Sequence, residues 1–153
     1  MEWFTGHSQS YQLAMKTIER LTDLGIIVRI ACSVTPQNVT QMEEIANIGY
    51  NLGAVAVAFG PIAPIGRAKG RKDLILSYNG KAYNTFLSNM EELLKKYGSS
   101  FINVIDAQAQ VSTNCGVGSK GLVIAPNLDV RLCQMFDVII GNIKSYNGSI
   151  KIC

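Results

Sequence analysis

The feature that most constrains the fold is a unit of helix, glycine and apolar strand that occurs twice. A helical apolar pattern over residues 10–24 ends at Gly25 and is followed by the apolar run 26–34. A second helical pattern ends at Gly53 and is followed by the apolar run 54–59, which begins 28 residues after the first run. Short apolar runs that alternate with helices are typical of parallel strands covered on both faces. The sequence therefore predicts an α/β protein with a parallel sheet.

Further elements continue this pattern. Asn38 followed by Gln41 resembles a capping box, which predicts that a helix begins there and runs to Gly53. An apolar stripe predicts another helix over residues 81–97, and Phe101 to Ile105 is predicted to be a further strand.

A sheet of two or three parallel strands needs neighbours, because its edges are open and both of its faces must be covered. We therefore predict that residues 1–100 are the last units of a partial, TIM-like β/α barrel. Residues 101–153 are predicted to begin a second, small module that opens with a β-hairpin. On this interpretation the chain is an internal or truncated piece of a larger enzyme.

The composition excludes several classes of function. A net charge of +3 is too small to indicate nucleic acid or a membrane surface as a partner. No apolar run approaches the roughly 18 residues that span a bilayer, and the N-terminus lacks a secretory pattern. Four widely spaced cysteines favour reduced thiols in the cytoplasm over a disulfide framework. One of them, Cys32, lies in an apolar run and is predicted to be a small buried core residue.

The other three cysteines belong to the C-terminal third of the chain. Two short apolar runs joined by the turn sequence 126–129, Pro-Asn-Leu-Asp, predict a β-hairpin. Such a hairpin can bring Cys115 and Cys133 toward each other. Two thiolates placed in this way could bind a soft metal, or supply part of the set of four ligands that an iron–sulfur cluster needs.

The segment from Cys115 to Cys133, together with the Gly-Asn-Ile sequence at 141–143, resembles the opening of the SPASM domain. This domain is the auxiliary-cluster module at the C-terminus of many radical S-adenosylmethionine enzymes. Where the family usually has the turn glycine, this chain has Leu128. The resemblance implies that Cys115 and Cys133 are metal ligands of an auxiliary 4Fe-4S cluster, with sulfur atoms within roughly 7 Å of each other. Cys153 is predicted to lie away from them, and it would be a third ligand if it joined them.

Residues 1–100 resemble the barrel of the same enzymes. Residues 3–8 are similar to the loop after the fourth strand, 34–38 to the end of the fifth strand, and 59–68 to the Pro-x-Gly-Arg-Ala loop after the sixth. In the family the last two regions help to surround S-adenosylmethionine. The cofactor-binding residues implied by this resemblance are Ser33, Thr35, Asn38, Gly66 and Arg67.

The family's reducing 4Fe-4S cluster requires the spacing CxxxCxxC, which none of the four cysteines forms. S-adenosylmethionine and the radical cluster are therefore expected in the parent enzyme only, and this chain alone is expected to lack catalytic residues and activity.

The alternation of side chains along the strands points independently to a binding face. Arg29, Ala31 and Ser33 share one face of the first strand, and the apolar Val28, Ile30, Cys32 and Val34 share the other. We expect the bulky face to pack under helices and the small face to line a lumen. The alternative is that the alanines only allow a helix to approach closely.

The loop after the second strand is basic. Two interpretations of Arg67 are open: it holds a carboxylate of the cofactor or of a peptide, or it is simply solvated. The other cations of this loop, Lys69, Arg71 and Lys72, are expected to be solvated.

The sequence thus predicts part of a radical S-adenosylmethionine enzyme with a SPASM domain, acting on a peptide, a protein or a small molecule. The alternatives are a non-catalytic metal-binding or scaffold protein on a β/α remnant, with zinc in place of the cluster, and an ordinary β/α binder whose cysteines are structural.

Overall fold

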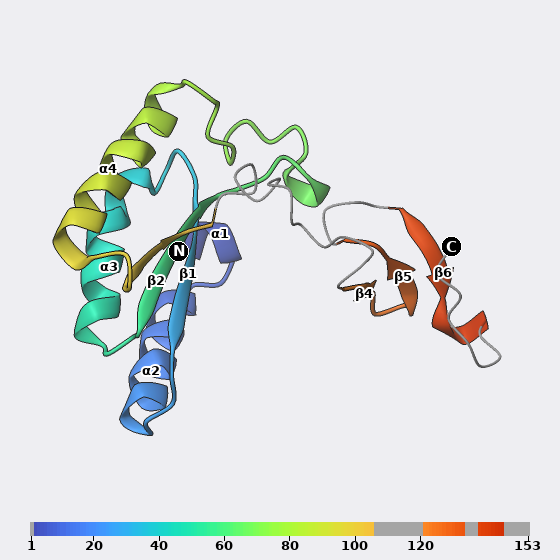
Figure 1. Cartoon of the computed structure of the whole chain (residues 1–153), viewed down its shortest axis with the longest axis horizontal. Coiled ribbons are helices and arrows are strands. Elements are labelled where there is room, and N and C mark those ends of the chain that lie inside the picture. Colours follow the sequence, from blue (N-terminus) through green and yellow to red (C-terminus); the bar gives the residue numbers. More distant parts are fainter. Residues whose placement is uncertain (1, 106–120, 134–137, 146–153) are drawn as a thin grey trace. The chain divides into compact units, whose positions relative to one another are not determined.

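The computed structural model describes residues 2–105, 121–133 and 138–145, whose helices and strands are shown in Figure 1. The chain divides into two compact units, Met1–Ala107 and Gln108–Cys153. Within the described residues, no helix has the length and apolar character needed to span a membrane.

The first unit is built on a parallel sheet with the strand order β1-β2-β3. These strands are β1 (Arg29–Val34), β2 (Ala56–Pro61) and β3 (Ile102–Val104). The predicted parallel sheet is confirmed, and its place in a partial barrel stays a prediction. Because β3 pairs with β2, the strand predicted at the start of the second module belongs instead to the first unit.

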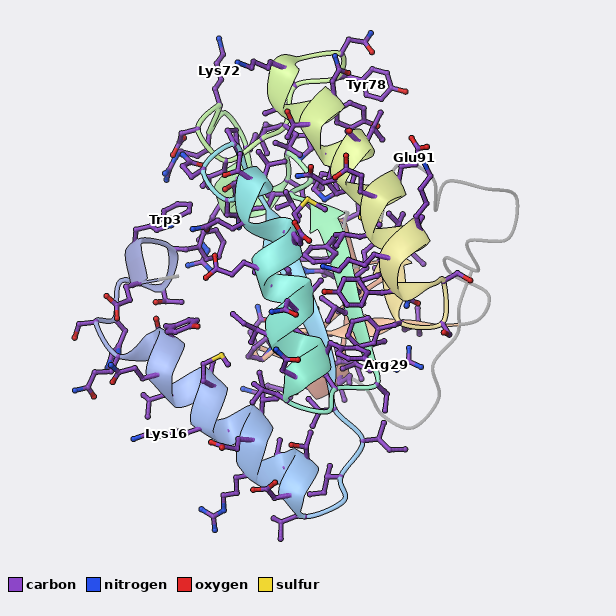
Figure 2. All side chains as sticks on the ribbon, turned by 90° about the vertical axis from the view of Figure 1, so that its left-hand side faces the viewer. Trp3, Lys16, Arg29, Lys72, Tyr78 and Glu91 are labelled. Atoms are coloured by element: carbon purple, nitrogen blue, oxygen red, sulfur yellow. The ribbon has the colours of Figure 1, made fainter. Side chains whose placement is uncertain are left out.

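Two helices precede β1, and one helix lies in each connection between consecutive strands of this sheet. They are α1 (Glu2–Thr5), α2 (Ser10–Asp23), α3 (Met42–Asn51) and α4 (Lys81–Tyr97), with short 3-10 turns η1 (Val39–Gln41) and η2 (Gly66–Ala68). The helices predicted over residues 10–24 and 81–97 are confirmed by α2 and α4. Figure 2 looks at the first unit from the side of α3 and α4, which lie in front of the sheet.

The capping box predicted at Asn38 and Gln41 does not form. The Asn38 side chain makes no cap to a helix, η1 intervenes, and α3 begins only at Met42. The Asn38 Oδ1 atom instead accepts a hydrogen bond of 2.8 Å from the backbone N–H of Thr35. The prediction was wrong because the preceding turn uses the side chain that the helix would have needed.

The core of the first unit lies between the sheet and the helices. Its buried residues are Val34, Val39, Met42, Ala46, Val57, Phe59, Leu76, Phe86, Met90, Leu93, Phe101 and Ile102. Ile30 and Cys32 pack against this core, whereas Arg29, Ala31 and Ser33 on the other face of β1 are exposed. The prediction that the bulky face of the strands packs under helices is confirmed.

Two glycines allow close approaches within this layer. A Cβ atom on Gly49 of α3 would lie 2.6 Å from Cγ2 of Val57, so the glycine lets the helix sit directly on β2. A Cβ atom on Gly60 would lie 2.4 Å from the backbone oxygen of Ile105, the residue that follows β3. The contact at Gly60 involves backbone, which cannot move aside as a flexible side chain can.

The described part of the second unit is an antiparallel sheet with the order β4-β5-β6. Its strands are β4 (Val123–Ile124), β5 (Asp129–Arg131) and β6 (Ile139–Asn142), followed by the 3-10 turn η4 (Ile143–Ser145). Val123 pairs with Arg131 across the β4–β5 turn, and Asp129 pairs with Asn142 on the other side of β5.

We predict that Gly60→Ala lowers the free energy of unfolding by about 1–3 kcal/mol, because the added methyl group displaces the backbone at Ile105. Urea unfolding followed by circular dichroism measures the change. Gly141→Ala is the matched control, since Gly141 also lies in a strand and a Cβ atom there meets nothing within 4 Å. Equal effects of the two substitutions would contradict the close approach at Gly60.

Candidate functional site

The candidate site lies at the carboxyl edge of the first sheet. In the parallel pairing of β1 with β2, Ser33 is opposite Gly60 and Val34 is opposite Pro61. The loops that follow these strands therefore leave the sheet at the same edge, as Figure 1 shows. The five residues predicted to bind the cofactor all belong to this edge or to these two loops, and ligands of β/α proteins approach the carboxyl ends of strands.

The loop after β1 is held in shape by the side chain of Asn38. Its Oδ1 atom accepts hydrogen bonds from the Thr35 backbone N–H at 2.8 Å and from the Thr35 hydroxyl at 3.3 Å. Its Nδ2 atom donates to the Ser33 carbonyl at 3.0 Å. Thr35 is 0% exposed, so both of its donors are satisfied inside the protein. Thr35 and Asn38 thus build the loop rather than offer side-chain groups at its surface.

The other three predicted cofactor-binding residues are exposed. Ser33 lies on the small, open face of β1, and Gly66 and Arg67 form the start of the η2 turn after β2. Gly66 has a φ of +53°, a left-handed conformation that favours glycine. Ser33 and Arg67 therefore present a hydroxyl and a guanidinium group to solvent at the carboxyl edge, where a polar ligand can reach them.

Cys32 points to the opposite, helix-covered face. It packs against the core, and burial raises the pKa of its thiol to about 11. A thiol with so high a pKa stays protonated near neutral pH and is a poor nucleophile and metal ligand. This agrees with the prediction that Cys32 is a core residue.

In the second unit, a polar network fixes the turn between β4 and β5. The Asn127 side chain donates to the Asp129 carboxylate at 2.6 Å, and the Asn142 side chain donates to the same carboxylate at 2.8 Å. These two hydrogen bonds hold the pKa of Asp129 below its usual range. Asn142 also donates to the Asn127 carbonyl at 3.2 Å, so it ties β6 to the turn.

Leu128, at the position where the related motif has glycine, adopts a φ of +68°. A left-handed conformation costs a residue with a Cβ atom roughly 1–2 kcal/mol. The turn keeps this conformation because the Leu128 backbone is bonded on both sides. Its N–H donates to the Ala125 carbonyl at 2.8 Å, and its carbonyl accepts from the Ile143 N–H at 2.9 Å.

No role was predicted from the sequence for Asp129 or Asn142, although both side chains are central to this network. The signal for them was present, because both belong to the motif segments that resemble the SPASM opening. In the structure the Asp129 and Asn142 side chains join the β4–β5 turn to β6, which explains why the motif contains these residues.

Comparison with known proteins reveals a related sequence and a solved structure of similar fold. The chain is 30% identical over 142 residues to the antilisterial bacteriocin subtilosin biosynthesis protein AlbA of Bacillus subtilis (strain 168), a match that covers 92% of this chain and 31% of AlbA. The crystal structure of Streptococcus suis SuiB bound to S-adenosylmethionine matches 88% of this chain and 35% of SuiB, with a TM-score of 0.61 and 11% identity. No protein-family model matches.

These two matches agree with the family resemblance of the motifs. The chain is related in sequence to AlbA and similar in fold to SuiB, and its motifs resemble those of radical S-adenosylmethionine enzymes of the SPASM type. It spans about a third of the length of each of the two proteins. The match to SuiB concerns the fold, and the match to AlbA runs through both units of the chain.

Of the two cysteines predicted to bind an auxiliary cluster, only Cys133 belongs to the described residues. Cys133 is half-buried and follows β5 by two residues. Cys115 and Cys153 lie outside the described residues, so the proximity of Cys115 to Cys133 and the separate place of Cys153 stay predictions. Among residues 2–105, 121–133 and 138–145, no three or more His, Cys, Asp or Glu side chains are grouped so as to hold a metal ion.

We predict that Asn38→Ala lowers the free energy of unfolding by about 1–3 kcal/mol, because it leaves the buried donors of Thr35 unsatisfied. Asn38→Asp keeps the acceptor for Thr35 and should cost less. Asn84→Ala, on the exposed surface of α4, is the control. Chemical denaturation measures the free energy of unfolding of the three variants. An Asn38→Ala protein as stable as Asn84→Ala would show that the loop does not depend on Asn38.

Proposed function

We propose that this chain is part of a radical S-adenosylmethionine enzyme with a SPASM domain that modifies a peptide. The observation that carries the proposal is the continuous sequence match to a bacteriocin biosynthesis protein over 92% of the chain. The fold of an S-adenosylmethionine-bound protein, matched over 88% of the chain, supports it.

In this proposal residues 1–100 are the C-terminal portion of the barrel and supply one wall of the S-adenosylmethionine site. Ser33, Gly66 and Arg67 are accessible at the carboxyl edge and would contact the cofactor. The Arg67 guanidinium suits a carboxylate by its fork of donors. Thr35 and Asn38 would act indirectly, by holding the loop after β1 in its shape. In the parent enzyme these residues would hold S-adenosylmethionine, which together with a reducing cluster would supply radical chemistry.

In the same proposal, the part of residues 101–153 that follows β3 is the N-terminal part of a SPASM domain. Cys115 and Cys133 would contribute two thiolates to an auxiliary 4Fe-4S cluster, whose remaining ligands come from elsewhere. The hydrogen-bonded β4–β5 turn supports this assignment, because it gives the strand that leads to Cys133 a fixed register. The half-buried setting of Cys133 suits a cluster, which proteins partly shield from solvent.

We predict that the chain binds iron and sulfide through these two cysteines. After anaerobic reconstitution in excess small-molecule thiol, which supplies the remaining ligands, and desalting, the chain should retain both elements and absorb in the visible region. Cys133→Ala should lose most of this signal, because a thiolate ligand is removed. Cys32→Ala is the matched control and should keep it, since Cys32 lies in the core.

Metal analysis of the same samples separates the proposal from its alternatives. Zinc without iron or sulfide would favour a non-catalytic metal-binding or scaffold protein. Iron and sulfide retained equally by the Cys133→Ala and wild-type chains would contradict the role of Cys133. No metal in any sample would favour a β/α binder with structural cysteines.

A further inference from the structure

The loop that follows β2 holds all of the net positive charge of this chain. Residues 66–73, here called the basic loop, contain four cations and one acid. The rest of the chain contains ten cations and ten acids, so its charges cancel, and the net charge of +3 belongs to these eight residues. Such a local excess creates a positive potential that attracts anionic partners.

One of the four cations is paired within the basic loop. Arg71 donates to the carboxylate of Asp73 through Nε at 2.8 Å and through Nη2 at 2.6 Å. Arg67, Lys69 and Lys72 are exposed, and no acid in residues 2–105, 121–133 and 138–145 forms an ion pair with them. In Figure 2, the Lys72 side chain extends away from the ribbon into solvent. Three cations are thus available to a partner.

The backbone of the basic loop is organised by successive turns. The Lys69 N–H donates to the Gly66 carbonyl at 3.1 Å, and the Arg71 N–H donates to the Ala68 carbonyl at 3.0 Å. Leu76, which comes soon after the loop, is 6% exposed and anchors the segment in the core. Because the backbone of the loop is already ordered, the loop loses less conformational entropy on binding than a flexible segment would lose.

Exposed apolar side chains lie on either side of the basic loop in the sequence. Ile65 directly precedes it and is 37% exposed, and Tyr78 follows it and is 66% exposed. The Tyr78 ring packs against Tyr83 with centroids 4.9 Å apart, which supports it from α4. Cations flanked by apolar groups suit a peptide that carries both carboxylates and apolar side chains. A nucleic acid would draw on a wider footprint of phosphate contacts.

We propose that the basic loop binds an acidic segment of the peptide on which the parent enzyme acts. The proposal rests on the proposed function, and it adds the charge of the substrate and the place where it binds. Lys69 and Lys72 would hold the carboxylates of the peptide at the carboxyl edge of the sheet, next to Arg67 of the candidate cofactor site. The predominantly electrostatic contact should weaken as salt is raised.

The test compares two double variants of equal charge. Lys69→Glu/Lys72→Glu reverses two cations of the basic loop, and Lys16→Glu/Arg20→Glu reverses two exposed cations of α2. The probe is a fluorescent peptide of about twelve residues, long enough to span the loop when extended, in which glutamates alternate with apolar residues. Its partner probe has glutamine in place of every glutamate. Fluorescence anisotropy at low and high salt gives the affinities.

The proposal expects the wild-type chain and the α2 variant to bind the glutamate peptide alike, and the basic-loop variant to lose about tenfold in affinity. The glutamine peptide should bind weakly to all three. Equal losses in both variants would overturn the proposal, because net charge alone would then explain binding. Tighter, loop-dependent binding of a single-stranded oligonucleotide or of phosphatidylserine vesicles would also overturn it.

Reconstitution of the basic-loop variant separates this proposal from the proposed function. Iron and sulfide retained at wild-type level, together with unchanged peptide binding, would reject the role of the basic loop and leave the enzyme assignment standing. Absence of iron and sulfide from the wild-type chain would instead reject the auxiliary-cluster part of the proposed function, whatever the basic loop binds.

Discussion

The packing of α3 and α4 against one face of the parallel sheet is the interaction on which the rest of the first unit depends. Val57 and Phe59 of β2 are 0% exposed beneath these helices, and Gly49 lets α3 approach the strand without a side chain between them. Because side chains alternate along a strand, burial of this face leaves Ala31, Ser33 and Ala58 on the other. Apolar packing on one face therefore determines which residues line the face proposed for ligands.

The same packing determines where the polar groups gather. With β1 and β2 parallel and in register, their following loops leave one edge, and the chain uses the two loops differently. The Asn38 side chain closes the first loop through hydrogen bonds. The second loop has a left-handed glycine at position 66 and three exposed cations that form no ion pair within the described part of the chain. A shaped loop beside a charged one provides both a contour and an electrostatic attraction for an anionic ligand.

Much of the fold could be predicted from the sequence because its signals are local. Helical spacing located α2 and α4 to within a residue, and the apolar runs located the three strands of the first sheet. The alternation along β1 identified its buried face correctly. The strand start was placed too early, because Ile26 and Ile27 are apolar but belong to the exposed connection after α2, where they are 49% and 76% exposed.

The parts that could not be predicted depend on competition between partners. Asn38 has the sequence signature of a helix cap, yet its amide is used by Thr35 and Ser33, which only the three-dimensional turn reveals. Leu128 has no sequence signature for a positive φ, and the turn imposes it through bonds to Ala125 and Ile143. In both cases the hydrogen bonds of an irregular turn decide the conformation, and helical or strand spacing does not record them.

The central claim is that the open face and carboxyl edge of the first sheet form one wall of an S-adenosylmethionine site. Hydrogen–deuterium exchange of the chain with and without S-adenosylmethionine tests it most directly. The account predicts slower exchange in residues 33–38 and 62–68, with α2 and the β4–β6 sheet unchanged. Protection confined to α2 or to the second unit, or no protection at saturating cofactor, would contradict it.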